Sequence, residues 1–261
     1  MVIIDRRLVT GRLIVRYRTI IYEKKGKVCH ITLNRPQVGN AINTLMADEL
    51  ADACQAIERD EKISVVILKG AGDVFSAGSE SEERDAKGDV SGFIAGLKPV
   101  TIAAIDGVAL GEGLELALAC DIRVASDRAS FCLPQTTHGL IPSGGGTQRL
   151  PRLVGRGKAL EMILVAEPID AEEALDIGLV SKVVSPAKLF SIVEEWAERI
   201  ATQAPIALKY AKEAVNKGMD VTLEQGLRIE ADLYFLIQTT EDRMEGINAF
   251  KGKRPPRFKG E

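Results

Sequence analysis

The stretch ALGEGLELALACD, residues 109–121, decides how this chain folds and where its chemistry lies. The β-branched run VTIAAIDG before it, residues 100–107, predicts a buried strand, and the leucines and alanines after Gly113 predict a buried helix. Glu112 and Glu115 stand in the first turn of that helix. A carboxylate in apolar surroundings is costly unless it is paired or used in chemistry. The stretch therefore predicts a strand-to-helix unit with a functional carboxylate.

Similar units precede and follow this stretch. Residues 19–36 predict two short strands around a Lys-Lys-Gly-Lys turn, and residues 44–60 have the apolar spacing of a helix. The run SVVILKG, residues 64–70, predicts a buried strand, and residues 121–131 contain another. Strands that alternate with helices indicate an α/β architecture with mostly parallel pairing.

The two ends of the chain differ from this pattern. Two amphipathic helical stretches occupy residues 189–218 and 222–250, with expected breaks near Pro205 and at Thr239-Thr240. Residues 1–19 carry five arginines, which raises the possibility of a transit peptide. The arginines alternate with apolar residues, however, and an acidic residue lies among them, so we favour an N-terminal extension or an extra strand.

Composition limits the possible partners. The 34 basic and 37 acidic residues give a net charge of −3, which lacks the basic excess of a nucleic-acid binder. No segment reaches the roughly 20 apolar residues that span a bilayer, so no membrane partner is expected. The four cysteines have no paired metal-ligand spacing, and we expect them to be reduced core residues of a cytoplasmic protein without a metal site.

Three glycine-bearing segments lie where strands lead into helices or loops: FSAGSES (75–81), GVALGEG (107–113) and IPSGGGTQ (141–148). Glycine permits positive φ and lets backbone N–H groups converge on an anion or a polarised carbonyl. Structural turns explain any one segment equally well. A dinucleotide fingerprint fails because its third glycine would fall at Leu116, and a phosphate loop fails because its first would fall at Arg152.

Taken together and in this order, six segments resemble the enoyl-CoA hydratase/isomerase family, the crotonase superfamily, over residues 20–258. The segments are ITLNRPQVGNAIN (31–43), FSAGSE (75–80), KPVTIAAIDGVALGEGLELALACDIRVAS (98–126), LPQTTHGLIPSGGGTQRLPRLVG (133–155), AEEALDIGLVSKVV (171–184) and EDRMEGINAFKGKRPPRF (241–258).

The resemblance implies an α/β fold, a crotonase-like spiral of ββα units with a C-terminal helical trimerisation region. It divides the chain into an extension (1–19), a core with an acyl-CoA site (20–198) and a helical oligomerisation region (199–261). It further implies a homotrimer, often paired into a hexamer, in which Phe250 and Lys253 reach the nucleotide of a neighbouring subunit. Coenzyme A belongs to the substrate, and no other cofactor is implied.

The resemblance also places the thioester. In the family its oxygen lies between two backbone N–H donors, which here belong to Ser79 and Glu112. The family usually has glycine where Glu112 stands, yet the main-chain donor is kept. The backbone around Ala77 and Gly78 is expected to border coenzyme A.

Glu115 matches the family's catalytic glutamate, which activates or positions water. The second glutamate of the hydratases, which exchanges a proton with the substrate α-carbon, is replaced here by Gln135. An amide holds water but does not transfer a proton at neutral pH.

Three interpretations follow. Glu115 alone manages both water and proton in an enoyl-CoA hydratase, a carbon–oxygen lyase. Alternatively, Glu115 serves another family reaction, such as isomerisation, hydration of a ring dienoyl-CoA or carbon–carbon cleavage. The third possibility is acyl-CoA binding without catalysis. His138 is expected to be a loop residue and Glu80 a solvated charge, and residues 79–99 are expected to border the acyl pocket.

Overall fold

The structure, a computed structural model, describes residues 5–9, 12–80 and 89–261. Eight strands of these residues form one sheet. In spatial order they are β1 (Asp5–Val9), β2 (Arg12–Arg16), β3 (Ile20–Lys25), β4 (Val28–Leu33), β5 (Val65–Gly70), β6 (Val100–Ile105), β8 (Ile122–Ser126) and β11 (Lys182–Val184). The strands from β1 to β4 pair antiparallel, and those from β4 to β11 pair parallel.

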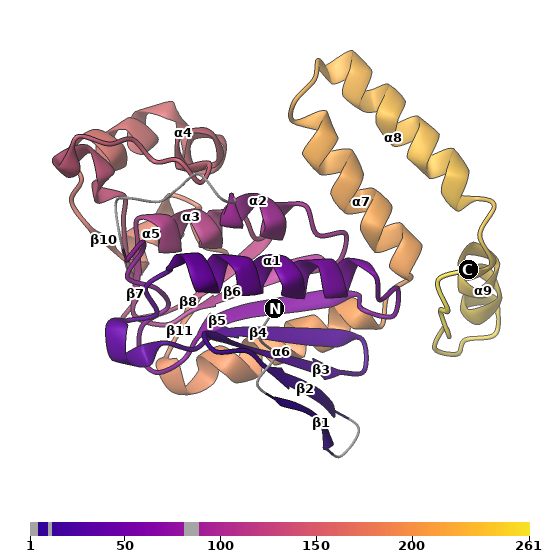
Figure 1. Cartoon of the computed structure of the whole chain (residues 1–261). Coiled ribbons are helices and arrows are strands. Elements are labelled where there is room, and N and C mark those ends of the chain that lie inside the picture. The colour runs from indigo at the N-terminus through magenta and orange to yellow at the C-terminus, as the bar shows by residue number, and fades with distance from the viewer. Residues whose placement is uncertain (1–4, 10–11, 81–88) are drawn as a thin grey trace.

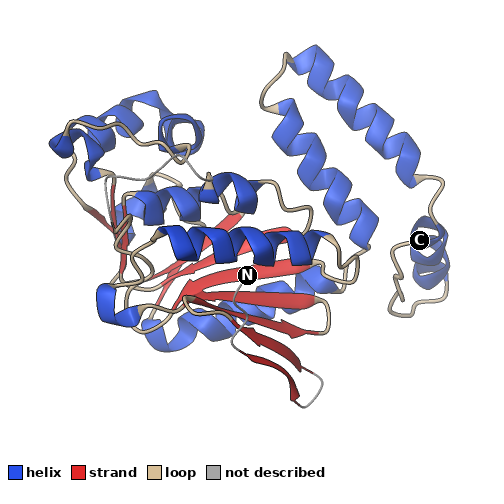
Figure 2. Cartoon of the chain, viewed as in Figure 1, coloured by secondary structure: helices blue, strands red, loops and turns tan. Residues whose placement is uncertain are grey.

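Helices cover both faces of this sheet (Figure 2). α1 (Thr44–Glu58), α2 (Val90–Ala95) and α3 (Glu112–Leu118) lie over one face, and α6 (Pro186–Ala201) lies over the other (Figure 1). Along β5, Val66 and Leu68 belong to the larger core on the α1 side, whereas Val65 and Ile67 pack with the α6 side. A strand buried on both faces must be apolar throughout, which explains the continuous β-branched runs in the sequence.

The N-terminal residues that the structure describes form strands, as their alternating pattern predicted. β2 pairs with β3, and β1 extends the sheet beyond β2. Arg12 Nη1 lies 2.9 Å from Glu23 Oε1 across the β2–β3 pair. This hairpin therefore adds two strands to one edge of the sheet.

A second, three-stranded sheet was not predicted. It contains β10 (Ile169–Asp170), β9 (Ser130–Cys132) and β7 (Val108–Leu110). Strands of two or three residues are too short to show an alternating pattern, which is why the sequence did not reveal them. The chain also forms the 3-10 turns η1 (Pro36–Val38) and η2 (Pro134–His138) and the helices α4 (Gly146–Leu164) and α5 (Ala171–Asp176).

The C-terminal part is helical, as predicted: α7 (Pro205–Gly218), α8 (Leu223–Ile237) and α9 (Glu241–Lys251). The breaks occur where they were expected, with Pro205 beginning α7 and Thr240 capping α9 by accepting a hydrogen bond from Arg243 N. Lys212 ties α7 to the core, because its Nζ donates to Pro99 O and lies 2.7 Å from Asp121 Oδ2. α8 and α9 stand away from the sheet (Figure 1).

The four cysteines are buried and free of disulfides, as predicted. None of the described helices combines the length and the apolar character that crossing a bilayer requires.

Candidate active site

Glu115 is the buried carboxylate that the sequence predicted. It lies in the first turn of α3 and is only 1% exposed. Gly111 begins the helix with a φ of 52°, a conformation that glycine adopts without strain. A side chain at Gly113 would meet Ser76, since a Cβ there would lie 2.6 Å from Ser76 Cβ. The glycines therefore let α3 start close against the neighbouring segment with its carboxylate inside.

Backbone amides and a side-chain amide hold the Glu115 carboxylate. Oε1 accepts hydrogen bonds from Gly144 N at 2.7 Å and Gly146 N at 2.8 Å, and Oε2 accepts one from Gln135 Nε2 at 3.2 Å. The backbone amides of the IPSGGGTQ segment thus converge on an anion, as the glycines suggested, and the anion is this side chain. Ordered donors fix the carboxylate in one position.

The surroundings of Glu115 raise its pKa. Burial raises the pKa of Glu115 above its ordinary value, and the charge of Glu112 adds to that rise, while the amides of Gly146 and Gly144 oppose it. A carboxyl with a raised pKa both accepts and returns a proton more readily near neutral pH. This position therefore suits a general acid–base group.

Gln135, at the start of η2, turns its amide in a defined direction. An ionised carboxylate only accepts hydrogen bonds, so the Nε2 group must face Glu115. Gln135 Oε1 is then buried, with no hydrogen-bond partner among the described residues. A buried acceptor of this kind beside a carboxylate is suited to hold a water molecule.

The segment with Ser79 runs beside β7. Ser76 N donates to Val108 O, and Leu110 N donates to Ser76 O, both at 3.0 Å. A Cβ on Gly78 would lie 2.8 Å from Leu110 O and 3.6 Å from the amide nitrogen of Glu112. The backbone before Ser79 therefore lies directly against the start of α3, as two converging amide donors would require.

Known proteins resemble this chain over almost its whole length. The profile of the Enoyl-CoA hydratase/isomerase family matches residues 23–261. The chain belongs to this family. A probable enoyl-CoA hydratase of Rhizobium meliloti is 42% identical over 254 residues, which cover 93% of this chain and 98% of that protein. The short-chain-enoyl-CoA hydratase of Clostridium acetobutylicum is 41% identical, covering 90% and 95% respectively.

Solved structures of the enoyl-CoA hydratase/isomerase family confirm the crotonase fold. The enoyl-CoA hydratase of Bacillus anthracis superposes with a TM-score of 0.90 at 40% identity, covering 94% of this chain and all 100% of that one. A second structure, from Geobacillus kaustophilus, gives a TM-score of 0.88 at 38% identity.

Other predicted residues lie around or apart from this centre. Ala77 and Gly78 lie on the segment beside β7, whereas Phe250 and Lys253 are exposed on and after α9, far from α3 in the same chain (Figure 1). His138 is an exposed turn residue. Glu80 is exposed but not simply solvated, because Arg35 Nη1 lies 2.7 Å from its Oε2.

The acyl-pocket segment, residues 79–99, is only partly described, since residues 81–88 lie outside the described residues. From Asp89 onward it forms the capped helix α2. Within the described part of the chain no three His, Cys, Asp or Glu side chains gather as metal ligands.

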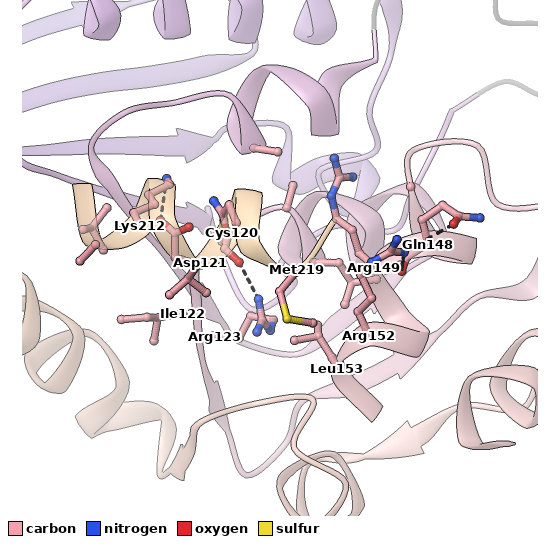
Figure 3. A pocket seen from close by; sticks show the side chains of 18 of the residues that line it. Cys120, Asp121, Ile122, Arg123, Gln148, Arg149, Arg152, Leu153, Lys212 and Met219 are labelled. Atoms are coloured by element: carbon pink, nitrogen blue, oxygen red, sulfur yellow. Dashed lines mark hydrogen bonds and ion pairs between the residues drawn. The ribbon is translucent and has the colours of Figure 1, made fainter. Parts of the chain in front are cut away.

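A cavity of about 1080 Å³ is lined by Asp121, Arg149 and Lys212, among other residues (Figure 3). It opens between the core and α7 and is lined by residues that include Cys120, Arg149 and Met219. Arg123 donates from Nη1 to Cys120 O at 2.6 Å at its wall. Glu115 does not line this cavity, so the cavity is separate from the carboxylate site.

The sequence missed one polar side chain next to Glu115. Ser91 on α2 is 1% exposed, and its hydroxyl has no hydrogen-bond partner among the described residues. A single serine in a short apolar stretch gives no signal in the sequence, because only the packing of α2 against α3 brings it to the site.

Proposed function

We propose that this protein is an enoyl-CoA hydratase-type lyase that adds water across the 2,3 double bond of an enoyl-CoA thioester, with Glu115 as its acid–base group. The observation that carries the proposal is the Glu115 carboxylate, buried and held by Gly144 N, Gly146 N and Gln135 Nε2. Family membership supports the same reaction, and the crotonyl-CoA hydratase of Syntrophomonas wolfei is 40% identical to this chain.

One carboxylate suffices for the proton balance. Water bound between Glu115 Oε2 and Gln135 Oε1 gives a proton to Glu115 as its oxygen bonds to C3 of the substrate. The π electrons move toward the thioester oxygen, which becomes enolate-like. Glu115 then returns the proton to C2, so that the water O–H bond breaks while C3–O and C2–H bonds form. The same group serving both steps predicts syn addition.

Two backbone amides would stabilise the enolate-like oxygen. We assign these donors to Ser79 N and Glu112 N, where the segment around Gly78 meets α3. Removing such a donor costs other enzymes about 3 to 4 kcal/mol of transition-state stabilisation. The start of a helix also favours negative charge, which fits the Glu112 position. The main-chain segment of Ala77 and Gly78 would border the coenzyme A moiety.

We also propose that the protein assembles as a homotrimer or as a hexamer formed by two trimers. α8 exposes a row of large apolar side chains, including Leu223, Leu227, Tyr234 and Phe235. Exposed apolar surface of this extent marks an interaction site. In such an assembly, Phe250 and Lys253 would reach the coenzyme A nucleotide of a neighbour. The free buried thiols support a reducing compartment, the cytoplasm.

The test is incubation with crotonyl-CoA, following the loss of the enoyl absorbance and identifying the product by mass. The unmodified protein is expected to form a 3-hydroxyacyl-CoA, and Glu115→Gln is expected to form none. Gln135→Glu supplies a second carboxyl group. General acid–base catalysis by such a group typically accelerates a reaction roughly 100- to 10,000-fold.

Each outcome separates the candidate functions. Water addition by the unmodified protein supports the one-glutamate hydratase. Activity that appears only in Gln135→Glu would show that the glutamine redirects the site, and cyclic and branched CoA thioesters would be assayed next. Binding of crotonyl-CoA without turnover of any of these thioesters would support the third candidate function, acyl-CoA binding without catalysis.

A further inference from the structure

The hydroxyl of Ser91 is buried near the proposed acid–base group, with no hydrogen-bond partner among the described residues. Ser91 lies in the first turn of α2, among the apolar side chains Val90 and Ile94. Its Oγ makes no hydrogen bond within the described residues. A buried hydroxyl left without a partner is destabilising, and most such groups bond to ordered water.

Ser91 and Glu115 both lie close to Gly144. A Cβ built on Gly144 would lie 3.0 Å from Ser91 Oγ, 3.2 Å from Glu115 Cβ and 3.3 Å from Glu115 Cδ. The Ser91 hydroxyl therefore lies at most about 6.3 Å from Glu115 Cδ. A water molecule that bridges two polar groups covers a separation of this order.

We propose that Ser91 is a positioning residue: its hydroxyl holds a buried water that donates a hydrogen bond to the Glu115 carboxylate. This inference rests on the proposed function, because it takes Glu115 as the reacting base. Oε1 accepts from Gly144 N and Gly146 N, whereas Oε2 accepts from the Gln135 amide. The water held by Ser91 is a donor additional to the reacting water proposed between Oε2 and Gln135 Oε1, since a carboxylate oxygen accepts more than one hydrogen bond.

Other charged groups near Glu115 stay in place when Ser91 changes. Glu112 lies on the same helix, and Arg149 on α4 donates from Nη1 to Gly144 O at 2.6 Å. Asp89 at the start of α2 is occupied as the helix cap, accepting from Gly92 N. The loss of the Ser91 hydroxyl therefore changes one donor only.

The experiment measures the pH dependence of crotonyl-CoA hydration by Ser91→Ala. Losing a donor to the charged form raises the pKa of the carboxyl group, so the acidic limb of kcat/KM should move upward by about half a pH unit. We expect kcat to fall about tenfold with KM unchanged, the lower range for a hydrogen bond to a charged group. The control Ser126→Ala removes an equally buried hydroxyl from β8 and should leave the pH limb in place.

A second variant addresses the water itself. Gly144→Ala places a methyl group in the space between Ser91 and Glu115, so it should displace the water and produce a similar upward shift. If both changes act through one water, adding Ser91→Ala to Gly144→Ala should cause no further shift.

The outcomes are distinct. An unmoved acidic limb in Ser91→Ala, or additive shifts in the double variant, would overturn the role of Ser91. Activity retained in Glu115→Gln would overturn the proposed function instead. A dead Glu115→Gln together with an unshifted Ser91→Ala would refute this inference alone.

Discussion

At the scale of single residues, Glu115 combines burial with a dense set of donors. Burial raises its pKa, and the Gly144 and Gly146 amides oppose that rise without cancelling it. Such a carboxyl group destabilises the folded state once it is ionised, because the unfolded chain ionises it at lower pH. Stability and chemistry therefore make opposite demands on this position.

Replacing Glu115 by Gln should abolish turnover, retain acyl-CoA binding and raise the free energy of unfolding at neutral pH. The sign follows from the raised pKa: the native state binds the proton more tightly, so stability is lost as pH rises through the titration, and an amide does not titrate. Calorimetric titration with an acyl-CoA and urea unfolding at pH 7 would check both parts. Lower stability of the variant would contradict the electrostatic account.

Gln135→Leu should remove the donor to Glu115 Oε2, which lies 3.2 Å away, together with the acceptor proposed for water. The pKa of Glu115 should then rise further, and the acidic limb of the activity profile should move up. We expect kcat to fall roughly 100-fold, since both orientation of water and proton transfer are affected. A fall in kcat without a shifted limb would mean that Gln135 acts on water alone.

At the scale of elements, the site depends on how closely the segment before Ser79 approaches β7 and α3. Gly78 has a φ of 92°, and a Cβ there would lie 2.8 Å from Leu110 O. Gly26, in the β3–β4 turn, also has a positive φ of 60° but has no atom within 4 Å of such a Cβ. Substitutions at these two glycines therefore distinguish the cost of backbone strain from the cost of losing a close approach.

Gly78→Ala should therefore reduce both activity and stability. Gly26→Ala should lower the free energy of unfolding by only about 1 kcal/mol, the cost of backbone strain. The larger effect at Gly78 comes from pushing its backbone away from Leu110 and spreading the proposed amide donors. Steady-state kinetics and urea unfolding of the two variants provide the comparison. Equal losses in both would argue against close packing at the site.

The α6 side of the sheet carries a separate titrating group. His30 on β4 is buried, with Nε2 3.3 Å from Glu194 Oε1, and burial lowers the pKa of His30 to about 4. Between about pH 4 and the ordinary histidine value near 6.5, the unfolded chain binds more protons than the native protein.

Stability should therefore fall as pH drops below about 6.5, and His30→Gln should remove roughly 1 to 3 kcal/mol of that dependence. Denaturant unfolding at pH 7 and pH 4.5 measures the difference, with exposed His138→Gln as the matched control. If the His30→Gln protein kept the full pH dependence of stability, that dependence would come from other groups.

At the scale of the whole molecule, α8 has an apolar face that the chain itself leaves uncovered. Phe235 is 70% exposed and Leu223 is 79% exposed. α7 packs against the core through Lys212, whereas α8 stands away from it (Figure 1). This arrangement is expected when a second copy supplies the missing contact.

Phe235→Glu should shift the sedimentation profile from trimers toward monomers, because a charge would be buried in the proposed interface. Asp232→Asn changes an exposed polar residue of the same helix and should leave assembly intact. If neighbours share the coenzyme A site through Phe250 and Lys253, KM should rise with dissociation. If Phe235→Glu remained a trimer, the interface would not include this face of α8.

The sequence by itself determined the α/β fold, the strands around β5 and β6, the breaks at Pro205 and Thr240, and the family, because periodic apolar runs and turn residues act locally. It also singled out Glu115 as a buried carboxylate. Only the tertiary structure decided which groups surround that carboxylate. Gln135 and the Gly144 amide come from the stretch between β9 and α4, Ser91 comes from α2 and Glu115 from α3, and no local pattern encodes the meeting of these three parts of the chain.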